Sequence, residues 1–176
     1  PDFVKEESEN GDAEISAKAL APEYKRALRE STEVQILETL GTLLELIKKN
    51  IPCRTAALFR RNSAGSLQLF LYDSESEAVV LGAIIGKGEG LVGQIIKEKG
   101  GKNILEGDIR TTSNTLLYYN ADQGIKSIAG VPLAIGDSCR GALLIDSDVK
   151  GAFTNDTVEV LERFAHVAAA IQYYAY

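Results

Sequence analysis

The stretch KSIAGVPL, residues 126–133, decides the fold of this chain together with GALLID, residues 141–146, which follows closely. Both are β-favouring runs, and we predict strands over 125–135 and 140–147. The turn around Gly136-Asp137-Ser138 that separates them is too short for a crossover helix. The two strands must therefore pair antiparallel, and a mainly antiparallel sheet is the predicted core of the fold.

Upstream of this hairpin, apolar runs alternate with turn-forming residues. Asn62-Ser63-Ala64-Gly65 is a turn cluster between two such runs and predicts a second hairpin. Residues 90–99 repeat apolar side chains on one helical face and predict a short helix that Gly100-Gly101 ends. Residues 108–124 form a polar segment that is long for a connection, so we expect a functional loop there. Further strands are predicted over 55–61, 67–73, 78–85 and 102–105.

A helix is predicted at each end of this region. The first begins at Pro22, and Thr32 with Gln35 forms a capping-box pattern that leaves one long helix or two short ones open. The last begins at Thr154, a favourable N-cap. Both carry apolar side chains at alternating spacings of three and four. These side chains either form a seam with the helices of a second copy or lie on the chain's own sheet. If they form a seam, Leu161→Glu should weaken dimerisation and leave the sheet folded. The seam residues are Leu37, Leu40, Leu44 and Ile47 in the first helix and Leu161, Phe164, Ala168 and Ile171 in the last.

Composition restricts the class of protein. The net charge is −6 and no basic cluster follows Pro52, which argues against direct binding to nucleic acid. No apolar run approaches the ~18 residues of a membrane span. Cys53 and Cys139 match neither a CxxC nor a metal-ligand pattern, which favours a reduced, cytoplasmic chain. Because the chain begins with Pro1 and contains no Met, we expect a fragment. Its predicted parts are a flexible acidic linker over 1–21, a helical dimerisation segment over 22–52, and a folded domain over 53–176.

The hexapeptide GEGLVG, residues 88–93, matches the GxGxxG pattern of dinucleotide-binding folds. Such a fold needs parallel βαβ units, whereas the predicted hairpin is antiparallel, so we do not predict one. Two interpretations of this hexapeptide remain. It forms a tight turn without ligand contact, or it turns into a helix whose free N–H groups bind an anion. His166, the only histidine, lies beside polar positions of the last helix, so we expect a solvated side chain. We expect Asp146 and Asp148 to shape a turn. No catalytic or metal constellation is predicted.

From Arg54 to Ile171, the GEGLVG turn followed by a hairpin that feeds a helix at Phe153-Thr154 resembles a GAF domain. The resemblance implies an α+β fold with a mainly antiparallel central sheet and terminal helices on one face. On the other face, a short helix and a long loop would cover a pocket. The stretch 116-LLYY-119, with 125–127 and 131–133, is similar to bacterial GAF sensors that precede diguanylate cyclase domains.

The resemblance implies a regulatory domain without catalysis of its own. It would sense an unidentified small molecule and relay its state through the helices of a homodimer to a covalently linked output domain. Small residues on strand 125–135 leave room for a ligand or only for a closely packed helix. A second hypothesis is a ligand-free dimerisation module whose cavity is filled by Leu117 and Tyr118. A third, an enzyme like the free methionine sulfoxide reductases, would need cysteines clustered at the pocket. No cofactor is identified, and the expected ligand contacts are Ala83, Gly90, Leu91, Asp108, Tyr118, Tyr119, Ser127, Ala129 and Val131.

Overall fold

Every pair of neighbouring strands in the central sheet runs antiparallel. The structure is a computed structural model and describes residues 22–110 and 115–175; the predicted linker, residues 1–21, lies outside the described residues. The strands are β1 (Thr55–Arg61), β2 (Leu67–Ser74), β3 (Ile84–Ile85), β4 (Ile104–Glu106), β5 (Ser127–Ile135) and β6 (Ser138–Ser147). They form a six-stranded sheet in the order β3-β2-β1-β6-β5-β4. The two predicted hairpins therefore meet at the centre, where β1 pairs with β6.

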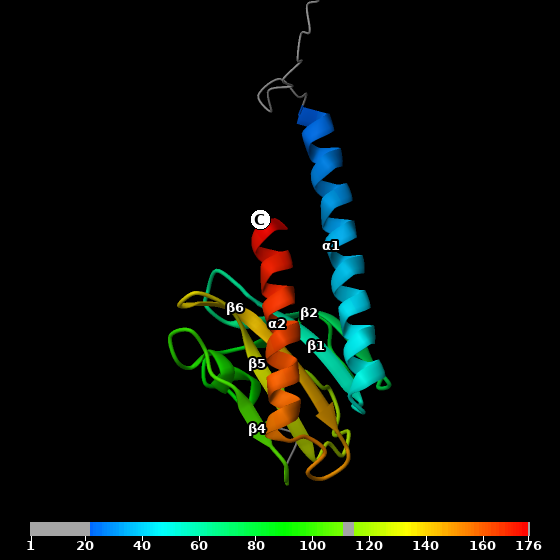
Figure 1. Cartoon of the computed structure of the whole chain (residues 1–176), viewed down its shortest axis with the longest axis vertical. Coiled ribbons are helices and arrows are strands. Elements are labelled where there is room, and N and C mark those ends of the chain that lie inside the picture. The colour runs from blue at the N-terminus through cyan, green and yellow to red at the C-terminus, as the bar shows by residue number, and fades with distance from the viewer. Residues whose placement is uncertain (1–21, 111–114, 176) are drawn as a thin grey trace, which may run out of the picture.

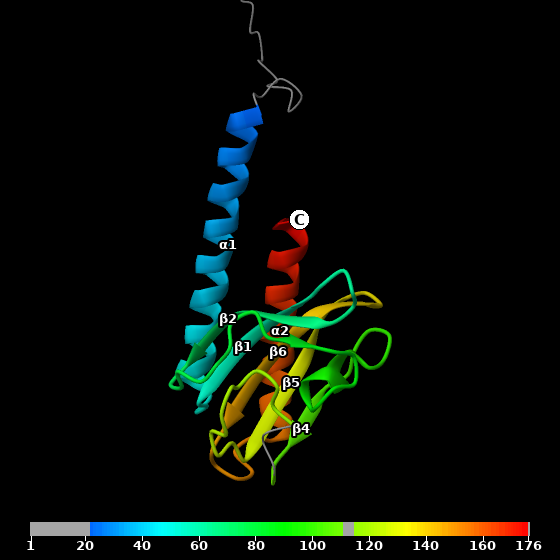
Figure 2. The same cartoon turned by 180° about the vertical axis from the view of Figure 1, so that it is seen from behind.

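Helices cover one face of the sheet and less regular segments cover the other (Figures 1 and 2). On the first face, α1 (Pro22–Asn50) and α2 (Asn155–Ala175) lie side by side, and α1 extends well beyond the sheet (Figure 1). The opposite face carries the 3₁₀ helix η1 (Val92–Ile96) and residues 115–125, which we call the covering segment. These layers confirm the predicted α+β architecture.

The terminal helices begin where the sequence predicts. α1 is a single helix of 29 residues, so the alternative of two short helices is wrong. α2 follows Thr154, whose side-chain oxygen accepts a hydrogen bond of 3.4 Å from the backbone N–H of Thr157, as expected for an N-cap. Within residues 22–110 and 115–175, no helix combines the length and apolar character that crossing a membrane requires.

Most of the predicted dimer seam is buried inside this chain. Leu37 is 45% exposed, and Phe164 and Ile171 are half-buried at the edge of the helix-side core. The other five seam residues pack against the sheet and are at most 1% exposed. Because they are already covered, their interpretation as a surface for a second copy is wrong, and the second half of α1 belongs to the domain core. These five residues are Leu40, Leu44, Ile47, Leu161 and Ala168.

Two predicted elements are shorter than expected, and a glycine turn interrupts the first of them. Of the strand predicted over 78–85, only β3 is regular: Gly82 has a φ of +85°, and the Ala83 N–H bonds to the Val80 carbonyl in a turn. The helix predicted over 90–99 is reduced to the 3₁₀ turn η1. The strand predicted over 102–105 starts later, as β4.

Candidate functional site

Asp146 is a fully buried carboxylate near the centre of the sheet. It lies on β6 in the same alternation as Ala142 and Leu144, whose side chains contact the covering side, so it points toward the covering segment. The Tyr118 hydroxyl donates a hydrogen bond of 2.6 Å to Asp146 Oδ2, and the Tyr119 hydroxyl donates one of 2.8 Å to the same oxygen. One carboxylate oxygen therefore ties the covering segment to the sheet.

Tyr118 fills the space beneath the covering segment. Its side chain is fully buried, its ring meets Phe59 edge-on at a centroid distance of 5.9 Å, and the Tyr119 ring lies 4.6 Å away. The backbone is held as well, because the Tyr118 carbonyl accepts a hydrogen bond of 2.9 Å from the Val80 N–H. Tyr118, an expected ligand contact, occupies the covered region of the sheet with its own ring.

A chain of hydroxyl groups extends this contact across the sheet. The Tyr119 hydroxyl lies 2.6 Å from Thr55 Oγ1, which is 2.6 Å from Ser74 Oγ. Thr55 is also the register partner of Asp146 between β1 and β6. The network thus links three adjacent strands to the covering segment, and a movement of Tyr119 changes hydrogen bonds on each of them.

A second polar contact anchors the end of the covering segment. Gln123 Oε1 accepts hydrogen bonds from Arg54 at 3.3 Å and from the Ser76 hydroxyl at 2.6 Å. The Arg54 guanidinium also forms an ion pair of 3.5 Å with Asp148, and its Nε is buried without a hydrogen bond. Arg54 therefore holds both the covering segment and the chain just after β6.

Burial raises the pKa of Asp146 to about 6. The hydrogen bonds from Tyr118, Tyr119 and the Thr55 backbone and the charge of Arg54 favour the ionised form, but they do not offset the loss of hydration. Burial and the nearby Asp146 charge also raise the pKa of both tyrosines. Asp146 Oδ1 makes no hydrogen bond of good geometry with any residue that the structure describes. A buried carboxylate in this state is costly, and shifted groups of this kind are typical of functional sites.

The GEGLVG sequence forms a tight turn at the entrance to η1. The Gly88 N–H bonds to the Gly93 carbonyl at 2.8 Å, and the Glu89 carboxylate accepts the Gly86 N–H at 2.7 Å. A Cβ at Gly93 would lie 2.3 Å from the Gly86 carbonyl oxygen, so glycine is required there. The sequence thus forms a tight turn, and the antiparallel sheet excludes a dinucleotide-binding βαβ unit. The Leu91 N–H bonds to the Thr115 carbonyl and joins the turn to the covering segment.

The structure distributes the other predicted ligand contacts over several places. Ala83 and Leu91 pack, half-buried, against the core below the covering segment, and Gly90 lies in the adjoining turn. Asp108 instead forms an ion pair of 2.8 Å with Lys150, which lowers the pKa of the carboxyl group.

The predicted placement of Ala129 and Val131 on the ligand face is wrong, because both pack against the helices. Alternation puts Ala129 and Val131 on one face of β5, but β5 is buried on both sides, so its apolar pattern does not reveal which side is which. Ile128 faces the covering side, where a Cβ at Gly130 would lie 2.8 Å from Ile95 Cδ1. The Ser127 hydroxyl donates a hydrogen bond of 2.7 Å to the Val149 carbonyl.

The sequence predicts Asp146, the central residue of the site, as a turn former, whereas the structure places it inside β6. It is the last residue of the apolar run GALLID, and a carboxylate that continues a buried strand is the signal that could have revealed it. The partnership of Arg54 with Gln123 joins residues far apart in the chain and has no local signal.

The two cysteines lie on opposite faces of the sheet. Cys139 belongs to the core under the covering segment, whereas Cys53 packs at the edge of the helix-side core. Burial raises the pKa of both thiols, that of Cys53 to about 12. Among the described residues, no group of three or more His, Cys, Asp or Glu side chains is arranged to hold a metal ion.

The family comparison covers most of the region described above, since the model of the GAF domain family matches residues 33–171. The chain belongs to the GAF domain family. GAF domains are generally regulatory sensor modules, and the match begins within α1, which agrees with the burial of its second half. A comparison with curated proteins found no match.

Solved structures with the same fold include GAF domains of other proteins and free methionine-R-sulfoxide reductases. The GAF domain of a phosphoenolpyruvate-protein phosphotransferase from Acinetobacter is 12% identical, with a TM-score of 0.67 over 89% of this chain and 96% of that chain. A type II free methionine-R-sulfoxide reductase from Thermoplasma acidophilum is 20% identical, with a TM-score of 0.67 over 80% and 94%. A free methionine-R-sulfoxide reductase from Neisseria meningitidis is 17% identical, with a TM-score of 0.64 over 83% of this chain and 86% of that chain. At these identities the comparison establishes the fold and leaves the activity to the site.

Proposed function

We propose that this GAF domain is the small-molecule-sensing part of a signal transduction protein. In the proposed mechanism, Tyr118 and Tyr119 close the site over Asp146, and a ligand that binds Asp146 displaces the covering segment. The observation that carries the proposal is the buried Asp146 carboxylate, which has one oxygen shared by two tyrosines and one without a good hydrogen bond. If this position had only a structural role, an apolar side chain would give a more stable core, because burying a charge costs several kcal/mol.

The chemistry of the site defines the class of ligand. Asp146 offers hydrogen-bond acceptors only, so the ligand must supply a donor, most favourably an ammonium or guanidinium group. The Tyr118 ring occupies an apolar space beside Phe59 and Leu116, so the ligand also needs an apolar body of comparable size. A ligand of this kind would replace the contacts of Tyr118 and favour an open covering segment.

The sheet provides a route from this site to the helices. Asp146 is adjacent in β6 to Ile145, which faces the opposite side and packs in the same core cluster as Leu161 of α2. A shift of β6 therefore acts on α2, and we propose that α1 and α2 relay it to a covalently linked output domain, such as a diguanylate cyclase. Val167, which is 50% exposed on α2, is the residue through which a homodimer would form in this proposal.

The ligand-free module remains the competing hypothesis, since the filled space around Tyr118 is also what that hypothesis predicts. Differential scanning fluorimetry with a panel of small amines and guanidines separates the two. We expect a ligand to raise the unfolding temperature of the wild-type chain, to lose that effect in Asp146→Asn, and to keep it in the control Tyr72→Phe. A panel without any stabilising compound, or equal stabilisation of Asp146→Asn, would support the ligand-free module instead.

A further inference from the structure

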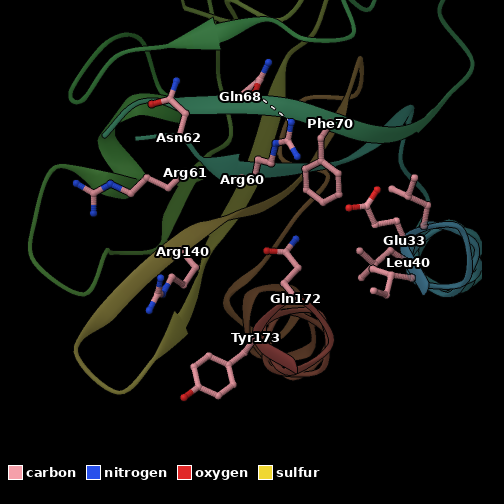
Figure 3. A pocket seen from close by; sticks show the side chains of 12 residues that line it. Glu33, Leu40, Arg60, Arg61, Asn62, Gln68, Phe70, Arg140, Gln172 and Tyr173 are labelled. Carbon is pink, nitrogen blue, oxygen red and sulfur yellow. Dashed lines mark hydrogen bonds between the residues drawn. The ribbon is translucent and has the colours of Figure 1, made fainter. Parts of the chain in front are cut away.

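A cavity of about 760 Å³ lies between the projecting ends of α1 and α2 and the β1–β2 hairpin, on the side of the sheet away from Asp146 (Figure 3). We call it the helix–hairpin cavity. Its volume is within the range of small-molecule sites. Its lining is Glu33, Ile36, Leu37, Leu40, Arg60, Arg61, Asn62, Gln68, Phe70, Arg140, Gln172 and Tyr173.

One wall of the helix–hairpin cavity is positively charged. Arg60 lies over the Phe70 ring, with its guanidinium carbon 6.0 Å from the ring centroid, and donates a long hydrogen bond of 3.5 Å to Gln68 (Figure 3). Arg61 donates to backbone carbonyls only. Together with Arg140, these arginines form no ion pair with any carboxylate in the described part of the chain. In a protein with a net charge of −6, this cluster is a local concentration of positive charge.

The rest of the cavity combines apolar and polar side chains. Leu40 and Phe70 form its floor, and Leu37 remains 45% exposed beside them. Gln172 points from α2 toward Phe70 (Figure 3), and its buried side-chain nitrogen has no acceptor among the described residues. Glu33 disfavours a second negative charge at the α1 side.

We propose that the helix–hairpin cavity binds a free amphiphilic molecule with one anionic head group and an aliphatic chain. The head group binds the arginine wall, most directly Arg60 and Arg140, through charge-assisted hydrogen bonds. The chain covers Leu37 and Phe70 and removes their apolar surface from water. Because the cavity contacts both helices and the hairpin, the bound molecule holds the projecting ends of α1 and α2 in one arrangement. This site is separate from Asp146 and does not depend on the function proposed for it.

Isothermal titration calorimetry with dodecanoate, below its micelle concentration, tests the proposal on the whole chain. We expect one dodecanoate per chain and binding at least tenfold weaker for dodecanol, which lacks the charge. The double variant Arg60→Gln/Arg140→Gln should also bind dodecanoate about tenfold more weakly, whereas Arg163→Gln, an exposed arginine of α2 outside the cavity, should change affinity less than twofold. Circular dichroism confirms that each variant is folded.

Several outcomes would overturn the proposal: absence of binding, equal binding of dodecanol, or equal binding by the double variant. Phosphatidylglycerol vesicles provide a further arm, since they offer an anionic head group only at a membrane surface. Sedimentation of the chain with these vesicles would indicate that the arginine wall binds a membrane surface, and this result would also overturn the proposal. Tyr118→Phe separates the two sites, because it should leave dodecanoate binding unchanged even if ligand binding at Asp146 is lost.

Discussion

The hydroxyl of Tyr118 donates a hydrogen bond of 2.6 Å to Oδ2 of Asp146, and both side chains are fully buried. Tyr118 belongs to the covering segment and Asp146 to a central strand, so this contact joins the two layers where a ligand of the proposed class would enter. It makes the closed state dependent on one hydroxyl group and one carboxylate. The stability of the chain should report directly on both.

Removal of the Tyr118 hydroxyl should destabilise the chain. Tyr118→Phe leaves the ring in place but deprives a buried carboxylate of one of its two side-chain donors, and we expect a loss of about 1.5–3 kcal/mol. The matched control is Tyr72→Phe, because Tyr72 is half-buried and its hydroxyl has no hydrogen-bond partner among the described residues. Urea unfolding measures both variants. Equal stability of the two would show that the Tyr118 contact has no energetic role.

Asp146 should make stability depend on pH. Its pKa is about 6 in the folded chain against an ordinary value of 3.8, so the folded state binds this proton more tightly than the unfolded state. The stability from this group is fully present below about pH 4 and is lost as the pH rises through about 6. The gap between the two pKa values corresponds to about 3 kcal/mol.

Comparison with Asp146→Asn isolates this effect, since asparagine does not titrate. The difference in free energy of unfolding between the two proteins should change in favour of the variant between about pH 4 and pH 7. Urea unfolding across that range gives the difference directly. A difference that stays constant with pH would mean that Asp146 has an ordinary pKa.

Two glycine-to-alanine substitutions should change the stability of the chain in opposite directions. At Gly93 a Cβ would lie 2.3 Å from the backbone oxygen of Gly86, so Gly93→Ala should cost at least about 1–3 kcal/mol. At Gly41, inside α1, a Cβ meets nothing within 4 Å, and Gly41→Ala should stabilise by roughly 0.5–1 kcal/mol. Thermal unfolding followed by circular dichroism compares them. Tolerance of alanine at Gly93 would contradict the close approach seen at this turn.

The positions of Leu161 and Val167 on α2 lead to different expectations for glutamate. Leu161 is fully buried, so Leu161→Glu should unfold the domain rather than weaken dimerisation selectively, contrary to the expectation from sequence. Val167 is 50% exposed, and Val167→Glu should stay folded while weakening any association through α2. Circular dichroism and light scattering distinguish folding from association. A folded Leu161→Glu variant would contradict the burial of this residue.

The thiols should be unreactive in the folded chain. Burial raises the pKa of Cys53 to about 12 and raises that of Cys139, so both are poor nucleophiles near neutral pH. Ellman's reagent should modify both slowly in buffer and rapidly in urea. A thiol-dependent reduction of free methionine sulfoxide that is lost in Cys139→Ser would instead support an enzyme, the third hypothesis from the sequence.

Most of the strands could be predicted from the sequence, because strand propensity and turn residues act over a few neighbouring positions. β1 and the α2 N-cap at Thr154 lie where propensity and turn chemistry place them. The prediction failed where glycine conformation mattered, as at Gly82, and where a strand was buried on both faces, as at Ala129. In the second case, alternation relates neighbouring side chains to one another but does not fix the face that each occupies.

The sequence by itself determined the antiparallel hairpin over β5 and β6, the positions of both terminal helices and the GAF resemblance. The tertiary structure alone decided the sites. It placed Tyr118 on Asp146, and it turned separate residues into a basic wall, because β1 pairs with β6 and brings Arg60 opposite Gly141, next to Arg140. Hydrophobic patterns and turns act over a few residues, whereas a buried carboxylate or a charged cavity is made by side chains that only long-range strand pairing brings together.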